Sequence, residues 1–280
     1  MDTTIKQTRR RVLGTIAGGS LVGLAGCSGD AESLTVAYMP IFPDLQYFIM
    51  QDRDLLPAGI VGQEFTDGPA IVQAFASGDI DIAMFGVVPA MILIDRGIPA
   101  KVTAANIKEP MAILTHEEFG PMFETRGAAA FDAWEADRGR AFRFGTFPQG
   151  SVPDVLLRYW LTEGVGIAPS EVEIIELNGV NAVYAALASG EIDGTSIMDP
   201  VPSRVAADNL PYRILRTAAE VMPGQPAAVT LMSDAVRSAP IGEAFIGAHI
   251  AATEFINQES SATAGIIESS LGMPAETATA

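Results

Sequence analysis

The sequence contains very little lysine, histidine and cysteine. Its 280 residues include two histidines and one cysteine, and its only lysines are Lys6, Lys101 and Lys108. A surface that binds nucleic acid must be basic, so this composition argues against nucleic acid as a partner. A single cysteine also excludes a disulfide within the chain.

The chain is strongly acidic, with 34 Asp and Glu residues against 17 Lys and Arg residues and a formal net charge of −17. Scarce lysine together with abundant carboxylates resembles the composition of proteins from highly saline surroundings, and we expect a haloarchaeal source. Carboxylates could instead bind cations or a basic partner. That alternative fits less well, because the acidic residues are spread along the chain.

No pattern typical of catalysis or metal binding is present. His116 and His249 have neither the spacing of metal ligands nor that of a base beside a nucleophile. Ser151 lies in GSVPD, which is not the GxSxG turn of hydrolases, and no phosphate-binding or dinucleotide-binding glycine motif follows a predicted strand. We therefore expect no catalytic residue, no metal site and no cofactor.

The N-terminus has the pattern of an export signal. Thr8–Leu13 contains a twin-arginine motif, and the apolar stretch Val12–Leu24 is too short to cross a bilayer, which needs about 20 residues. The next residues, Leu24-Ala25-Gly26-Cys27, resemble a lipoprotein box, which implies a lipid on Cys27. We expect a signal peptide over 1–26, a lipidated cysteine and linker over 27–33, and a protein tethered to the outer face of the membrane.

An internal repeat indicates two related halves. ASGDID at 76–81 returns as ASGEID at 188–193. In both copies an apolar helix face runs into Ser-Gly, and a strand follows. Gly78 and Gly190 each suit the left-handed conformation that ends a helix. Chance recurrence in an α/β protein is the alternative reading.

Strands and helices alternate along the chain. Strands are predicted at 34–38, 61–66, 80–85, 101–106, 142–145, 172–177, 193–198 and 212–215, and helices at 44–55, 68–77, 88–96, 152–161, 182–189 and after Pro200. Strict alternation predicts parallel α/β sheets with helices on their faces. No regular pattern is found between His116 and Arg140.

Two further apolar runs, Met111–His116 and Ala227–Met232, are interpreted as the two connections between the halves. Lobe 1 is then 34–115 plus 227–280, and lobe 2 is 116–226. The segment from Ala239 onward has a helical pattern. Met273–Glu276 has the pattern of another helix start, which predicts either a short last helix or a chain that continues beyond Ala280.

In open α/β sheets ligands bind beyond the carboxyl ends of the strands. We therefore expect ligand contacts from residues that follow the predicted strands: Met39, Pro40, Phe42, Thr66, Phe85, Gly86, Gly150, Ser151, Asn178, Met198 and Asp199. Ser151 also suits a helix N-cap, where free N–H groups can bind an anion. Aromatic and methionine side chains at these positions could equally belong to the core.

The segments Phe65–Ala105, Gly145–Leu161 and Ala185–Pro200 resemble the solute-binding proteins of ABC importers in the nitrate, sulfonate, taurine and bicarbonate group. They are similar also to proteins that bind thiamine-pyrimidine precursors. The resemblance implies a type II periplasmic-binding-protein fold, with two α/β lobes joined by two crossover strands. It further implies a monomer that closes around a small anionic or heteroaromatic solute and delivers it to a membrane permease.

One departure concerns the ligand. Many relatives have an aromatic residue and Glu-Pro where this chain has Met198-Asp199-Pro200, so their ligand does not transfer directly. Two other functions remain open on the sequence. One is an enzyme of thiamine-pyrimidine or menaquinone-related biosynthesis on the same fold, and the other is a module that presents ligand to a membrane sensor.

Overall fold

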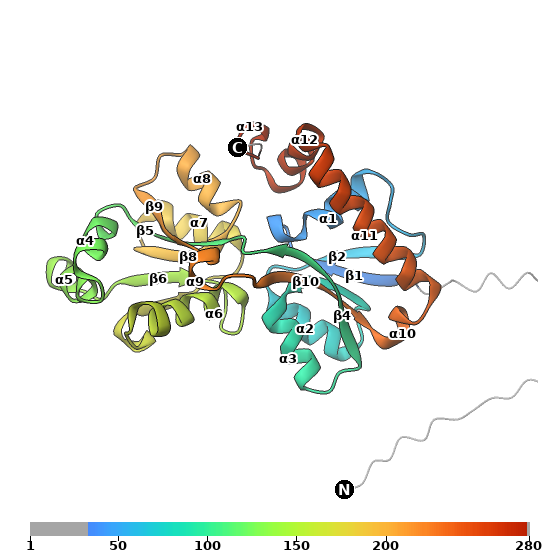
Figure 1. Ribbon diagram of the computed structural model, residues 1–280, viewed down its shortest axis with the longest axis horizontal. Helices are drawn as coiled ribbons and strands as arrows, with labels where there is room; N and C mark the ends of the chain where they lie inside the picture. Colours follow the sequence, from blue (N-terminus) through green and yellow to red (C-terminus); the bar gives the residue numbers. More distant parts are fainter. Residues whose placement is uncertain (1–32, 279–280) are drawn as a thin grey trace, which may run out of the picture. The chain divides into compact units, whose positions relative to one another are not determined.

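Ten strands form two separate five-stranded sheets in the computed structural model, which describes residues 33–278 (Figure 1). The expected signal peptide and Cys27 lie outside the described residues. The first sheet has the order β2-β1-β3-β10-β4. Its strands are β1 (Leu34–Tyr38), β2 (Ile60–Glu64), β3 (Ile82–Gly86), β4 (Ala100–Lys108) and β10 (Pro226–Ser233).

The second sheet repeats this arrangement with the order β7-β6-β8-β5-β9. Its strands are β5 (Met111–His116), β6 (Arg143–Thr146), β7 (Glu173–Glu176), β8 (Gly194–Met198) and β9 (Tyr212–Thr217). In each sheet three strands are parallel, and a strand from elsewhere in the chain is inserted antiparallel beside the third. That inserted strand is β10 in the first sheet and β5 in the second.

Helices lie on both faces of each sheet. In the first lobe, α1 (Leu45–Asp52) and α11 (Pro240–Gln258) lie on one side and α2 (Gly68–Ser77) and α3 (Val87–Asp95) on the other (Figure 1). In the second lobe, α6 (Val152–Tyr159) lies opposite α7 (Val180–Ser189) and α8 (Val201–Ala207). The remaining elements are η1 (Phe42–Asp44), α4 (Phe119–Arg126), α5 (Ala129–Arg138), η2 (Trp160–Val165), η3 (Pro169–Glu171), α9 (Ala218–Val221), α10 (Asp234–Arg237), α12 (Ser260–Leu271) and α13 (Ala275–Ala278). No helix between residues 33 and 278 combines the length and apolar character needed to span a bilayer.

The sequence repeat occupies equivalent places in the two lobes. Gly78 ends α2 and Gly190 ends α7, both in the left-handed conformation. The aspartate that closes each repeat then holds the start of a parallel strand of its lobe, β1 in the first lobe and β6 in the second. Asp81 accepts the Thr35 N–H at 2.9 Å, and Asp193 accepts the Arg143 N–H at 2.9 Å. The repeat therefore encodes the same helix stop and the same strand anchor twice.

The predicted boundary between the lobes differs from the observed strand pairing. Met111–His116 was expected to connect the lobes, with residues up to 115 in lobe 1. Instead all of β5 pairs with β8 and β9 inside the second sheet, and all of β10 lies in the first sheet. The chain crosses to the second lobe at Glu109–Pro110 and returns between β9 and β10. Each apolar run belongs to a single sheet over its whole length, because an extended strand is most stable when its backbone groups are fully paired.

The segment from His116 to Arg140, which showed no regular pattern, forms α4 and α5. These helices present Phe119, Phe123, Phe131 and Trp134 to Phe142 and Phe144 behind the second sheet. The aromatic side chains bury enough apolar area to hold two short helices whose glycines and charges obscure the helical period.

Candidate functional site

A small cavity lies between the two sheets. It has a volume of about 20 Å³, which is room for roughly one water molecule. The walls combine strand ends, helix starts and the two crossings. The lining residues are Met39, Ile41, Pro43, Gly68, Gly86, Pro89, Pro110, Met111, Phe147, Ser151, Val152, Pro153, Met198, Ala227 and Ala228.

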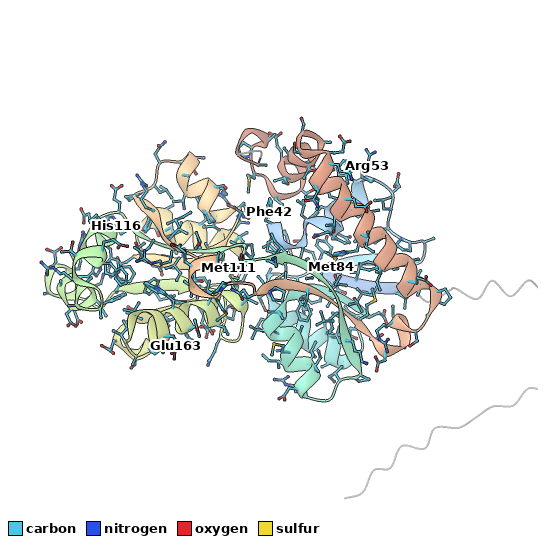
Figure 2. All side chains as sticks on the ribbon, viewed as in Figure 1. Phe42, Arg53, Met84, Met111, His116 and Glu163 are labelled. Carbon is cyan, nitrogen blue, oxygen red and sulfur yellow. The ribbon has the colours of Figure 1, made fainter. Side chains whose placement is uncertain are left out.

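The crossings form part of the cavity wall. Pro110 and Met111 come from the first crossing, and Ala227 and Ala228 come from the start of β10, just after the second. Met111 lies where the chain passes between the sheets, whereas His116 lies at the far end of the same strand (Figure 2). Movement of the lobes about the crossings would therefore change the cavity directly.

The lobes meet on both sides of the cavity. On one side the Phe42 N–H donates to the Asp199 carbonyl oxygen at 3.3 Å. On the other, a Cβ added to Gly86 would lie 2.7 Å from Val152 Cγ2, which is closer than van der Waals contact allows. Glycine at position 86 thus permits α3 and α6 to approach each other across the cavity.

The start of α6 is capped within its own lobe. Ser151 Oγ accepts the Asp154 N–H at 3.4 Å, and Pro153 contributes no N–H group. Asp154 is buried, accepts the Gly150 N–H at 3.1 Å and pairs with Arg158 at 2.7 Å. A carboxylate therefore already occupies the positive end of this helix.

The other helix starts near the cavity differ in whether a side chain caps their first-turn N–H groups. Asp67 caps α2 by accepting the Ala70 N–H at 2.8 Å, and Asp199 Oδ1 accepts the N–H and hydroxyl of Ser203 in α8. The start of α3 has no side-chain cap. Its first-turn N–H groups, on Val87 and Val88, have no acceptor within the helix and no side-chain cap.

The lining is almost entirely apolar. None of the lining residues carries a charge, and Ser151 is the one with a polar side chain. The charged residues that directly adjoin lining residues in the chain are Asp44, Asp67, Glu109, Asp154 and Asp199, and all of them carry carboxyl groups. This environment suits an uncharged group better than an anion, because no lining residue supplies a positive charge to offset the desolvation of an anion.

The two histidines lie away from the cavity. His116 Nδ1 lies 4.0 Å from Glu118 Oε2, and its ring lies against Trp134. His249 is buried on α11, and burial lowers its pKa to about 4. In the part of the chain that the structure describes, no group of three His, Cys, Asp or Glu side chains is arranged to hold a metal ion.

The structure places four of the predicted ligand-binding residues in the cavity wall. These are Met39, Gly86, Ser151 and Met198. Their contact with a solute remains a prediction.

The other predicted residues lie outside the cavity wall. Phe85 is fully buried in the core, because its side chain points into the sheet–helix layer, and Asn178 and Thr66 are exposed. Asp199 and Gly150 serve their own helix starts, and Pro40 and Phe42 flank the lining residue Ile41 without joining it. The end of a strand sets the position of a residue's backbone, whereas the direction of its side chain depends on the turn that follows.

Some of the lining residues missed by the sequence analysis belong to the crossings, and the others adjoin predicted residues or lie close to them in the chain. Pro110, Met111, Ala227 and Ala228 line the cavity. The two similar apolar runs did mark this region. Connections that pass between two lobes also form the floor of the space between them.

Comparisons with known proteins agree with this architecture. No curated protein sequence matches the chain. Among solved structures, the alkanesulfonate-binding protein SsuA from Xanthomonas axonopodis pv. citri, bound to MOPS, is similar at 20% identity and a TM-score of 0.71, over 88% of this chain and 82% of that chain. The periplasmic nitrate-binding protein NrtA from Synechocystis PCC 6803 is similar at 17% identity and a TM-score of 0.72, over 88% and 68%.

A ligand-binding component of an ABC-type import system from Staphylococcus aureus, with zinc bound, is similar at 19% identity and a TM-score of 0.70, over 88% and 81%. These likenesses confirm the predicted periplasmic-binding-protein fold with two α/β lobes. The sequence pattern of the NMT1-like family matches residues 28–268, which include both sheets and both crossings. The chain therefore belongs to the NMT1-like family.

Proposed function

We propose that this protein is an extracytoplasmic solute-binding lipoprotein of an ABC importer. It would act as a monomer, capture a small solute between its lobes and deliver it to a membrane permease. The observation that carries the proposal is the cavity between the sheets, whose wall is built from strand ends of both lobes and from both crossings. A binding site that both lobes share is what hinge closure requires.

Closure would follow from contacts that a solute makes with both lobes at once. Met39 and Gly86 belong to the first lobe, and Ser151 and Met198 belong to the second. A solute that touches both sets binds the closed arrangement more tightly than the open one, and this differential affinity shifts the population toward closure. The present cavity is too small for such a solute, so the lobes would have to part to admit it.

Of the two solute classes expected from the sequence, a neutral heteroaromatic compound fits the lining better than an anion. The wall offers apolar surface and one hydroxyl, and the uncapped start of α3 follows the lining residue Gly86. A ring with an acceptor nitrogen or oxygen could use these groups without placing a full negative charge near Asp154 and Asp199.

Export and tethering rest on the sequence. The twin-arginine motif and Cys27 support an exported chain with a lipid at its N-terminus. A lipidated cysteine that carries two chains anchors a protein stably in the membrane, whereas a single acyl chain holds it weakly. Cell fractionation with metabolic lipid labelling, comparing the unaltered chain with Cys27→Ser, tests this. Label that persists after Cys27→Ser would rule out the tether.

Thermal-shift screening and titration calorimetry in high salt test solute binding. The panel would contain nitrate, taurine, bicarbonate, MOPS and 4-amino-2-methylpyrimidine. We expect stoichiometric binding of the pyrimidine without conversion. Binding of the anions alone would refute the preference for a neutral ring, and turnover of the pyrimidine would favour the enzyme alternative.

A matched pair of helix-cap variants locates the site. Ser151 and Thr217 are both N-caps followed by an acidic residue at the third helical position, and both belong to the second lobe. Ser151→Ala should lower both stability and solute affinity, whereas Thr217→Ala should lower stability alone, by roughly 1 kcal/mol. Equal losses of affinity in the two variants would remove the start of α6 from the site.

A further inference from the structure

Five polar side chains are buried together in the first lobe, behind the wall of the cavity. Asp44 and Gln46 come from η1 and α1, and Asn106, Thr230 and His249 come from β4, β10 and α11. None of them lines the cavity, so the proposed binding step does not use them directly. Buried polar groups are costly, and a cluster of this size needs a structural or functional reason.

Asp44 connects the cluster to the cavity. Its carboxyl is fully buried, and Oδ2 accepts the Met39 N–H at 2.9 Å. Met39 lines the cavity, and it begins the segment Met39–Phe42 that we call the cleft loop. The Asp44 carboxyl therefore fixes the backbone of the cleft loop from behind.

Asn106 connects the cluster to β4 and β10, the strands of the first lobe that adjoin the two crossings. Its Oδ1 accepts from Thr230 Oγ1 at 2.8 Å and lies 3.1 Å from His249 Nε2. Its main-chain oxygen accepts from Gln46 Nε2 at 2.8 Å. Asn106 is near the end of β4, just before the first crossing, and Thr230 is on β10, just after the second.

The energetics of Asp44 argue against a role in stability alone. Burial raises its pKa well above the ordinary value, and the Met39 N–H and the nearby Asn106 side chain lower it only in part. Asp44 Oδ1 and Asn106 Nδ2 make no hydrogen bond within the described chain. Apolar side chains of the same volume would fill this space at lower cost.

We propose that Asp44 and Asn106 are positioning residues. Asp44 holds the cleft loop in its binding geometry, and Asn106 ties the segment that carries Asp44 to β4 and β10, through the hydrogen bond from Gln46 and the packing of η1 against both strands. When the lobes turn about the crossings, β4 and β10 shift near Asn106 and Thr230, and the cleft loop shifts with them. The consequence for solute affinity rests on the proposed function, whereas the mechanical link itself does not.

Hydrogen exchange measured by mass spectrometry on the full chain, without solute, tests the link. Asp44→Ala should accelerate exchange of the peptide covering 39–42 at least tenfold. Asp81→Ala is the matched control, because Asp81 accepts the Thr35 N–H at the opposite end of the same strand at the same 2.9 Å. It should accelerate exchange at 33–36 and leave 39–42 unchanged. Equal acceleration at 39–42 in both variants would overturn the positioning role.

Thr230→Val tests the connection to β10 and does not depend on whether Asp44→Ala folds. The Thr230 hydroxyl bonds to Asn106 on β4, and its loss should accelerate exchange at 39–42 at least threefold. The control is Thr103→Val, which removes a hydroxyl hydrogen bond to the main-chain oxygen of Thr230, at 3.2 Å between β4 and β10, and leaves the side chains of the cluster in place. No acceleration in Thr230→Val, or equal acceleration in Thr103→Val, would refute the link.

Calorimetry with the same solute panel tests the consequence for binding. If the unaltered protein binds a panel member, Asp44→Ala and Thr230→Val should weaken that binding at least tenfold and threefold, and both controls should stay within twofold. Unchanged affinity in all four variants would overturn the functional part of the proposal. If no panel member binds, it is the solute class of the proposed function that fails, and the exchange results still decide the mechanical link.

Discussion

The two lobes share one strand order but differ in the layer behind each sheet. In the first lobe this layer is built around Tyr47, Phe48, Phe245 and aliphatic side chains from α1, α11 and α12, with the polar cluster of Asp44 and Asn106 beside it. In the second lobe it is a nearly continuous aromatic cluster from α4, α5, the start of β6 and η2. The lobes share their hydrogen-bonding framework and differ in how the space behind it is filled.

The aspartates that close the two copies of the repeat also have the same role and different surroundings. Asp81 is partly exposed, and Asp193 is 5% exposed. Asp193 also forms an ion pair with Arg140, whereas Asp81 forms no ion pair among the described residues. A strand anchor can remain a lone carboxylate while water reaches it, but a buried one needs a cation. Four predictions test this comparison, from the largest expected effect to the smallest.

Trp134→Ala tests how far the second lobe depends on its aromatic layer. Trp134 is 1% exposed and packs against Phe119 and Phe142. The loss should reduce the free energy of unfolding by roughly 3–5 kcal/mol in denaturant titrations. Trp134→Phe is the control, because the indole N–H has no partner within the described residues and only ring size is lost. Equal costs for the two variants would contradict the packing argument.

His249 should make the first lobe sensitive to acid. Its pKa is about 4 in the folded protein and 6.5 when unperturbed, so between these values the unfolded chain binds more protons. Stability from this group is therefore present above pH 6.5 and is lost as pH falls to about 4, by roughly 3 kcal/mol in total. Asp44 acts in the opposite sense, since its raised pKa favours folding at low pH.

The measurement is the difference in unfolding free energy between the unaltered protein and His249→Leu across this pH range. The contribution of Asp44 largely cancels in that difference. A difference that does not change between pH 6.5 and pH 4 would show that His249 titrates normally.

Arg140→Met tests whether Asp193 needs its cation because it is buried. The substitution leaves the buried Asp193 with the Arg143 N–H but no cation, and should cost about 2 kcal/mol of stability. Adding Asp193→Asn should recover part of the loss, because the uncompensated charge is gone. If Arg140→Met alone is neutral, Asp193 needs its cation no more than Asp81 does.

Gly86→Ala should separate the lobes with little effect on either. The added Cβ would lie 2.7 Å from Val152 Cγ2, so the closed arrangement should lose roughly 1 kcal/mol, the low end for overpacking, because the lobes can part. Small-angle scattering should show a larger radius of gyration. Val152→Ala should restore the original value, and Gly120→Ala, with no neighbour within 4 Å of the new Cβ, should match the unaltered protein.

The sequence by itself determined the repeated unit, the alternation of strands and helices, and local signals such as the Ser151 cap and the glycine stops at Gly78 and Gly190. These features depend on a few neighbouring residues, whose periodicity and backbone preferences are local. They are the reason that the two-lobed fold can be predicted from the sequence.

The tertiary structure alone decided which residues meet across the chain. Met111–His116 was recognised as an extended run, but its pairing with β8 and β9 depends on strands more than 70 residues away. Asn106 and His249 are 143 positions apart, and no local pattern links them. Contacts of this kind depend on the register and packing of whole layers, so the cavity wall and the cluster behind it emerge only once both sheets have formed.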